Sequence, residues 1–331
     1  MSSPLAVTLG DPAGIGPEIV GKAWEARQFA GLPPFFAVGH EAALRRVWPG
    51  PVHQITAPAD AARHFDTALP FLQAADCPDA EPGNPTLESA RCALDTLGLA
   101  VGLAQSGAVS GLVTGPVAKS QLQAIGFTHP GQTEFIAERC GIAASNVAMM
   151  LAGPGLRVIP ITIHIALARV AEVLTTELIV SRGRTAARGL QRNFGIDAPR
   201  IAVAGLNPHA GEQGMMGDEE QLIIQPAIDA LCDEGFDAFG PISPDALFTP
   251  RARSGYDLVL CMYHDQGLIP LKALHVDEGV NMSLGLPIIR TAPDHGTAFD
   301  IAGQDRANPG AMIAAIKMAG EAAEYRAREV I

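Results

Sequence analysis

Several features that would define a specialised class of protein are scarce in this sequence. The 331 residues include five scattered cysteines and no C-x-x-C pair, which argues against a zinc ribbon or a redox motif. No apolar run approaches the roughly 20 residues that a membrane span needs. The opening MSSPLAVTLGDPAG has neither the basic start nor the unbroken apolar segment of a secretory signal. We therefore expect a cytoplasmic protein with no membrane association.

Positive charge is also scarce. Lysine and arginine number 23 against 35 aspartates and glutamates, for a net charge of -12. Binding to nucleic acid phosphates needs clustered cations, so no nucleic acid partner is expected. Any anionic ligand must instead be held by a few local positive groups.

What the sequence does contain is the pattern of an α/β protein. A chain of 331 residues exceeds the roughly 250–300 at which one core stops growing, so we expect two domains with a cleft. Apolar and β-branched runs alternate with helical stretches, which favours a largely parallel sheet. The runs are PLAVTL, PFFAVG, AVSGLVTG, LRVIPITIH, RIAVAGLN, YDLVLCMYH and PIIRTA. Polar clusters follow several of them, at the sheet edge where open α/β sheets bind ligands.

Three histidines each follow one of these predicted strands. His164, His209 and His264 are separated by 45 and 55 residues, a spacing that suits successive strands joined by helical crossovers. Imidazole suits zinc and related metals, and a catalytic site commonly has three protein ligands and an open position. A single strand-end histidine can equally well satisfy a buried carbonyl group, but three together favour a shared ion. Asp265 and Glu212 lie close enough in sequence to support two of the rings.

Two further segments suggest anion binding. A predicted glycine-bearing loop that follows the His264 strand contains Lys272, Asn281 and Arg290. An alternative interpretation is that the two cations are solvated surface charges that bind no ligand. The turn His295–Ala298 has small residues that let backbone N–H groups approach a phosphate. The opening GDPAGIGPE lacks the G-x-G-x-x-G spacing of a Rossmann fingerprint, so Gly14 and Gly16 fit a structural turn equally well.

These motifs, taken together, resemble one enzyme family. They run in order over essentially the whole chain: GDPAGIGPE, TGPVAK, GQTEF, GLNPHAGE, MYHDQGL, EGVNMSLGLPIIRT and DHGTA. They are similar to those of the 4-hydroxythreonine-4-phosphate dehydrogenase family of vitamin B6 synthesis. The resemblance implies an α/β fold like that of isopropylmalate and isocitrate dehydrogenases, with two α/β domains and a central cleft. Residues 1–127 and about 275–331 would form the terminal, cofactor-side domain, and about 128–274 the central metal and dimerisation domain.

The family pattern also assigns roles to residues. It makes His164, His209 and His264 ligands of a divalent metal, with zinc favoured over magnesium or cobalt, in a homodimer whose subunits share each site. It assigns substrate binding to Gln132, Thr133, Lys272, Asn281 and Arg290, and cofactor binding to His295, Gly296, Thr297 and Ala298. The candidates for the general base are Asp245, Lys119 and a metal-bound water. Gln132 stands where the family usually has histidine, which puts an acid or base role there in doubt.

The implied reaction is the oxidation of 4-hydroxythreonine 4-phosphate by NAD or NADP. The product, a 2-amino-3-oxo acid phosphate, then loses CO₂ to give 3-amino-2-oxopropyl phosphate. Two related readings remain: a dehydrogenase of 4-phosphorylated threonate or erythronate, and a dehydrogenase of a cis-dihydrodiol dicarboxylate. A different class is a non-catalytic anion-binding protein. Lys272, Asn281 and Arg290 favour a phosphorylated substrate, and the three histidines favour catalysis.

Overall fold

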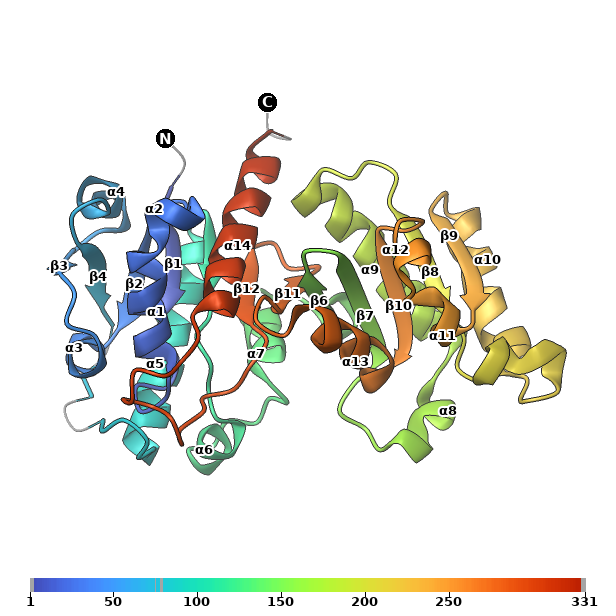
Figure 1. Cartoon of the computed structure of the whole chain (residues 1–331), viewed down its shortest axis with the longest axis horizontal. Helices are drawn as coiled ribbons and strands as arrows, with labels where there is room; N and C mark the ends of the chain where they lie inside the picture. The colour runs from blue at the N-terminus through green and yellow to red at the C-terminus, as the bar shows by residue number, and fades with distance from the viewer. Residues whose placement is uncertain (1–2, 75, 78–79, 329–331) are drawn as a thin grey trace. The chain divides into compact units, whose positions relative to one another are not determined.

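The computed structural model describes residues 3–74, 76–77 and 80–328, which divide into two compact units (Figure 1). Unit 1 comprises residues 1–141 and 286–331, and unit 2 comprises residues 142–285. The terminal segments thus share one unit, but the boundaries lie beyond 128 and 275. Residues 280–284 form a strand that pairs antiparallel with residues 148–152, which places that stretch in unit 2. Among the described residues, no helix is both long and apolar enough to cross a membrane.

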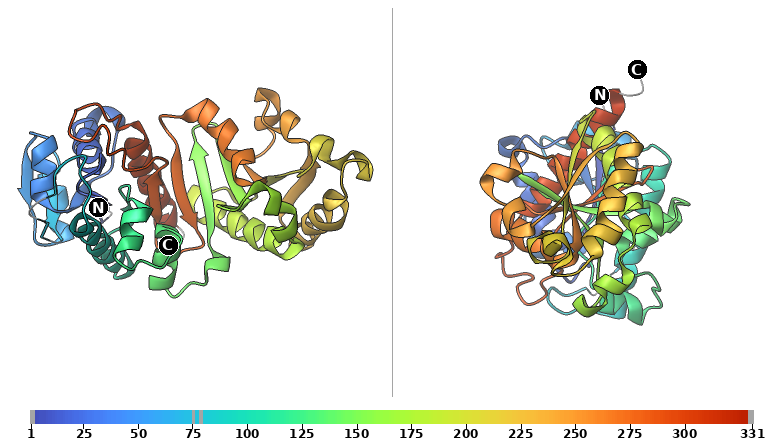
Figure 2. Two further views of the ribbon diagram at one scale, coloured as in Figure 1. Left: turned by 90° about the horizontal axis from the view of Figure 1, so that it is seen from below. Right: turned by 90° about the vertical axis from the view of Figure 1, so that its right-hand side faces the viewer.

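Unit 1 is built on a parallel sheet in the order β3-β4-β2-β1-β5-β12. Its strands are β1 (Leu5–Thr8), β2 (Phe35–Gly39), β3 (Val52–Gln54), β4 (Leu69–Gln73), β5 (Gly111–Val113) and β12 (Arg290–Pro293). Every residue of β1 and β2 is buried, which explains why their sequences are continuously apolar. Helix α5 (Leu87–Gln105) packs against β1, β2 and β5, and α14 (Gly310–Arg328) against β1, β5 and β12 (Figure 2).

The remaining helices of unit 1 are short. They are α1 (Gly16–Glu25), α2 (Arg27–Ala30), α3 (Glu41–Val47), η1 (Pro58–Asp60), α4 (Ala61–His64), α6 (Lys119–Ala124) and α7 (Gln132–Arg139). The start of the long helix α5 follows from local sequence. The Thr86 side chain accepts the Ser89 N–H and the Ser89 hydroxyl accepts the Thr86 N–H, which together form a capping box.

Unit 2 has a mixed sheet in the order β11-β6-β7-β10-β8-β9. Its strands are β6 (Ala148–Gly153), β7 (Leu156–Thr162), β8 (Arg200–Ala204), β9 (Asp237–Ile242), β10 (Leu258–Tyr263) and β11 (Val280–Leu284). Strands β7, β10, β8 and β9 are parallel, and β6 is antiparallel to both of its neighbours. The prediction of a loop from Lys272 to Arg290 was therefore wrong: Lys272 lies in a helix, Asn281 in β11 and Arg290 begins β12.

The helices of unit 2 join these strands. They are η2 (Ala144–Asn146), η3 (Leu167–Arg169), α8 (Val170–Val173), α9 (Thr176–Phe194), η4 (Pro208–Gly214), η5 (Glu220–Ile224), α10 (Gln225–Asp233), α11 (Pro244–Leu247), α12 (Pro250–Arg253) and α13 (His264–His275). Segment η5 has π-helical hydrogen bonding, a form often found near functional sites. Together the two units confirm the mixed α/β fold predicted from the sequence.

The glycines of the opening turn have a packing role. A Cβ on Gly16 would lie 1.8 Å from the Leu9 carbonyl oxygen, so any side chain there must displace backbone. We expect Gly16→Ala to lower the free energy of unfolding by about 1–3 kcal/mol, as overpacking does. Gly102→Ala in α5, where nothing lies within 4 Å, is the matched control and should be neutral or stabilising. Urea unfolding of the two variants measures the difference, and equal midpoints would contradict it.

Candidate active site

The three candidate metal-binding histidines follow the carboxyl ends of three neighbouring parallel strands. His164 lies two residues beyond β7, His264 directly follows β10, and His209 lies in η4, after β8. The strand order β7-β10-β8 places the His264 strand between the other two. Both His164 and His209 have left-handed backbone, with φ of 53° and 52°. Non-glycine residues adopt this conformation where the surroundings impose it, often at functional sites.

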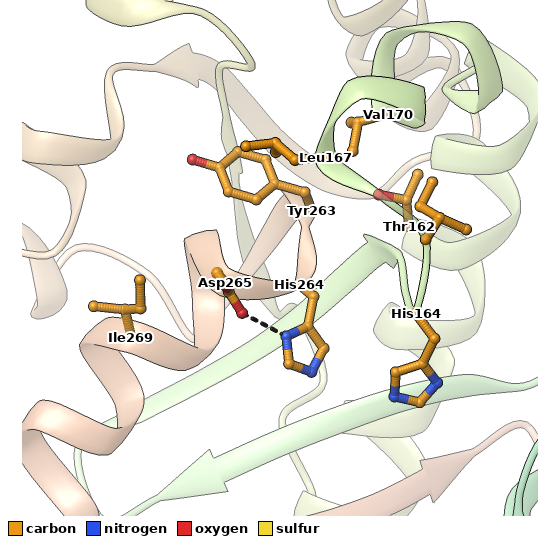
Figure 3. A pocket seen from close by; sticks show the side chains of 9 residues that line it. Thr162, His164, Leu167, Val170, Tyr263, His264, Asp265 and Ile269 are labelled. Carbon is orange, nitrogen blue, oxygen red and sulfur yellow. Dashed lines mark hydrogen bonds and ion pairs between the residues drawn. The ribbon is translucent and has the colours of Figure 1, made fainter.

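His164 and His264 face one pocket of about 420 Å³ in unit 2 (Figure 3). Their ring centroids are 5.7 Å apart. The pocket is lined by Thr162, His164, Ile165, Leu167, Val170, Tyr263, His264, Asp265 and Ile269. His264 Nδ1 lies 2.7 Å from Asp265 Oδ1, a contact that orients the ring and favours the tautomer with a lone pair on Nε2. Glu212, the other candidate supporting carboxylate, is exposed.

This pair suits a transition metal in its chemistry and placement, but the ligand set of one chain is incomplete. The described residues of a single chain contain no group of three or more His, Cys, Asp or Glu side chains placed to hold one ion. The three histidines therefore do not close around a metal within one chain. The metal assignment therefore stays a prediction.

Asp245 lies near the His209 segment. It is on α11, which packs against η4, and its side chain is exposed. A hydrogen bond from the Ser243 hydroxyl is the main cause that lowers the pKa of Asp245, and the nearby His209 acts in the same direction. The carboxylate is thus ionised at neutral pH, the state that a general base requires.

The second candidate site lies in unit 1 and centres on Arg290. This side chain is only 3% exposed, at the start of β12. Its Nε and Nη2 donate to Thr114 Oγ1 at 3.2 and 2.8 Å, and its Nη1 donates to Thr133 Oγ1 at 3.4 Å. Burial lowers the pKa of Arg290 to about 10, opposed by the carboxylate of Glu134. The guanidinium therefore remains charged at neutral pH and is held in a fixed orientation.

Other predicted residues gather around the Thr133 segment of unit 1. Gln132 Nε2 donates to the Gly115 carbonyl at 3.3 Å. The Lys119 side chain comes within 3.8 Å of the position of a Cβ on Gly131, so Lys119 lies beside this turn. The structure thus places Arg290 in contact with Thr133, which directly follows Gln132 in the sequence.

Two predicted substrate-binding residues belong to unit 2. Lys272 is exposed on α13, whereas Asn281 is partly buried on β11. The Oδ1 atom of Asn281 is buried and has no hydrogen-bond partner among the described residues, so it can still accept a bond from a ligand.

The predicted cofactor turn packs on the opening turn of the chain. The Ile15 N–H donates to the Thr297 carbonyl at 3.0 Å, and a Cβ on Gly14 would lie 3.0 Å from that same oxygen. Ala298 has left-handed backbone, with φ of 42°, and nothing lies within 4 Å of a Cβ on Gly296. The N–H of Gly296 is thus on backbone that a ligand can approach closely.

Thr114 is a functional candidate that sequence reasoning did not assign. It directly follows β5, and its position in a strand-end polar cluster was the only signal. We expect Thr114→Val, which keeps the shape but removes the hydroxyl acceptor, to raise KM about 10-fold because Arg290 loses two bonds. Thr114→Ser keeps the acceptor and should restore most of the affinity. Steady-state kinetics check this, and equal KM values for Val and Ser variants would contradict it.

Comparison with solved structures gives the class of protein. A 4-hydroxythreonine-4-phosphate dehydrogenase from Klebsiella pneumoniae is similar over 97% of this chain and 100% of its own, with a TM-score of 0.86 and 39% identity. A terephthalate 1,2-cis-dihydrodiol dehydrogenase from Burkholderia xenovorans is similar over 97% of this chain and 98% of its own, with a TM-score of 0.66 and 29% identity. The fold and these relatives together support an α/β oxidoreductase.

The sequence comparisons define the family. A 4-hydroxythreonine-4-phosphate dehydrogenase from Erythrobacter litoralis is 54% identical over 329 residues, which cover 98% of each chain. The sequence model of the pyridoxal phosphate biosynthetic protein PdxA family matches residues 33–319. The chain belongs to this family, which confirms the resemblance predicted from the motifs.

Proposed function

We propose that this chain is an NAD- or NADP-dependent 4-hydroxythreonine-4-phosphate dehydrogenase that acts with a divalent metal in cytoplasmic pyridoxal phosphate biosynthesis. The structural observation that carries the proposal is the buried, charged Arg290, held in place by Thr114 and Thr133. A guanidinium desolvated to this degree and oriented by the two threonine hydroxyls is suited to bind a phosphate. Relatives that are 54% and 39% identical over almost the whole chain bear the name of this activity.

In the proposed reaction the secondary alcohol of the substrate loses a hydride from carbon and a proton from oxygen. NAD or NADP, when bound, would be the hydride acceptor, and a divalent ion held by His164, His209 and His264 would supply Lewis acidity at the substrate oxygens. Asp245 is the first candidate to take the hydroxyl proton because it is ionised and lies near His209. Lys119, beside Gln132, is the second. The resulting 2-amino-3-oxo acid phosphate loses CO₂ to give 3-amino-2-oxopropyl phosphate.

The other proposed site residues bind the substrate or the cofactor. Arg290, Thr133 and Gln132 of unit 1 bind the phosphate, and Lys272 and Asn281 of unit 2 are also proposed to bind the substrate. Residues His295 to Ala298 present backbone to the cofactor. A set of imidazole ligands favours zinc, with cobalt next, over magnesium, which prefers oxygen ligands.

The alternative substrates are 4-phosphorylated threonate or erythronate and a cis-dihydrodiol dicarboxylate. The relative named for the dihydrodiol reaction is 29% identical, against 54% for a relative named for the phosphorylated amino acid, which favours the latter. A panel of these compounds assayed for NAD reduction tests the proposal. Fastest turnover of the dihydrodiol would overturn it, and NAD reduction with none of them would favour a non-catalytic binding protein.

We also propose a homodimer whose subunits share each site. Apart from Phe29, Leu87 and Leu99, the exposed large hydrophobic side chains of the described residues all lie in unit 2. They include Leu167, Met215 and Leu222, which are 69%, 82% and 65% exposed. Their concentration in unit 2 supports the proposal that this unit carries the subunit interface.

The dimer can be tested at this surface. We expect Leu222→Glu to weaken self-association, and activity should fall in parallel with the dimer fraction in sedimentation velocity. Phe29→Glu, at a fully exposed site in unit 1, is the matched control and should leave both unchanged. A fully active Leu222→Glu monomer would contradict site sharing.

A further inference from the structure

Three buried polar side chains, Thr162, Gln266 and Glu220, bond to backbone near the ends of the strands that precede the histidines. Thr162, at the end of β7, is 4% exposed, and its hydroxyl donates to the Met262 carbonyl of β10 at 2.7 Å. Gln266, 6% exposed in α13, accepts the Met262 N–H at 2.7 Å. Its Nε2 atom donates to the Gly205 carbonyl, just after β8, also at 2.7 Å. One line of buried hydrogen bonds therefore joins all three strand ends.

Glu220 extends this line to the segment before His209. Its carboxylate is buried, and Oε1 accepts the N–H groups of Leu206 and Asn207 at 2.8 and 2.7 Å. The Asn207 side chain donates to Oε2 at 3.0 Å. Three hydrogen bonds from residues 206 and 207 to one buried carboxyl group hold this backbone in place.

The segment that Glu220 holds is conformationally unusual. All five residues from His209 to Gln213 have left-handed φ values, and four of them are not glycine. Such a run is unfavourable in isolation and persists only where its surroundings impose it. The bonds of Glu220 and Gln266 to residues 205–207 constrain the backbone from which this run begins.

Each histidine lies within four residues of a residue in this line of hydrogen bonds. His164 lies two residues beyond Thr162, His264 two beyond Met262, and His209 four beyond Gly205. We propose that Thr162, Gln266 and Glu220 are positioning residues that fix the backbone of the three histidine segments before the metal binds at the site that two subunits share. The inference rests on the proposed metal site. None of the three is proposed as a ligand, and each acts through backbone atoms.

The test compares two identical substitutions. Gln266→Met keeps the length of the side chain and removes both bonds. Gln191→Met is the matched control in unit 2, since Gln191 also donates to a backbone carbonyl, that of Asp197, at 2.9 Å. Titration calorimetry with Zn²⁺ on the full-length metal-free proteins gives the affinity. We expect Gln266→Met to bind Zn²⁺ about 10- to 100-fold more weakly, the usual loss when a group supporting a metal ligand is removed. The control should bind as the unaltered protein does.

A second pair of variants keeps the test decisive if Gln266→Met does not fold. Thr162→Val removes only the hydroxyl donor and should also weaken Zn²⁺ binding, whereas Thr162→Ser should rescue it. A purely structural role would lower the melting temperature without changing the Zn²⁺ affinity of the folded protein. Unchanged affinity in both Gln266→Met and Thr162→Val would overturn the inference. His264→Ala distinguishes the two proposals: if it binds Zn²⁺ normally, the metal site itself is wrong.

Discussion

Replacing His264 with alanine is expected to abolish turnover while leaving the fold intact. The ring belongs to the strand between those of the other two histidines, faces the pocket beside His164, and is oriented by Asp265. Loss of a metal ligand removes Lewis acid stabilisation worth several kcal/mol, so the rate should fall by about a thousandfold or more. Because the His264 side chain is 36% exposed, its removal leaves no cavity in the core. His164→Ala should behave in the same way.

The measurement pairs kinetics with thermal unfolding. His53→Ala is the matched control, because His53 is an exposed histidine in unit 1 that stacks on His64, far in sequence from the pocket. It should keep full activity. If His264→Ala retained more than about a tenth of the original rate at a normal melting temperature, the ring would have a structural role only, and the metal proposal would fail.

Replacing Arg290 should separate substrate binding from stability. The lowered pKa of about 10, against 12.5 for an ordinary arginine, means that the fold disfavours the charged form by about 3 kcal/mol. Burial of this charge is therefore costly in the free protein. We expect Arg290→Met to melt no lower than the unaltered protein, because replacing a buried charge with an apolar side chain is often neutral or stabilising.

Catalysis should show the opposite effect. Without the guanidinium, kcat/KM for the phosphorylated substrate should fall roughly 10- to 150-fold. This corresponds to a loss of about 1.5–3 kcal/mol of transition-state binding energy. Arg290→Lys should recover only part of the loss, because lysine keeps the charge but lacks the planar fork that contacts Thr114 and Thr133. A phosphate-free analogue should be turned over equally by all three proteins. If Arg290→Met slowed both substrates alike, Arg290 would not bind the phosphate.

The parts of the fold that were predictable are those with continuous apolar runs. Strands β1, β2, β7, β8 and β10 are buried and bounded by turn residues, so their sequences identify them. Strands β3, β4, β6, β9 and β11 were not among the predicted runs, and β3 and β11 illustrate two of the reasons. The sequence of β3 is Val-His-Gln and largely exposed, and β11 begins beside Gly279 and contains Asn281, so neither resembles a buried strand.

The candidate site likewise has a part that the sequence predicts and a part that it does not. The histidines were identifiable because each follows a predicted strand, and that signal is local. The contact of Arg290 with Thr114 joins residues 176 apart, and that of Gln266 with Gly205 joins residues 61 apart. Both depend on strand order and register, which a single sequence does not specify. In the proposed homodimer, the meeting of three ligands at one ion also depends on how the two subunits associate.

The most direct test of the proposed activity is the reaction itself. The purified protein, freed of metal with a chelator, is mixed with 4-hydroxythreonine 4-phosphate and NAD or NADP, and both reduced cofactor and CO₂ are measured before and after Zn²⁺ or Co²⁺ is added. We expect no reaction without metal, and one CO₂ for each reduced cofactor once metal is restored. Equal rates with and without metal, or no cofactor reduction under any of these conditions, would contradict the proposed function.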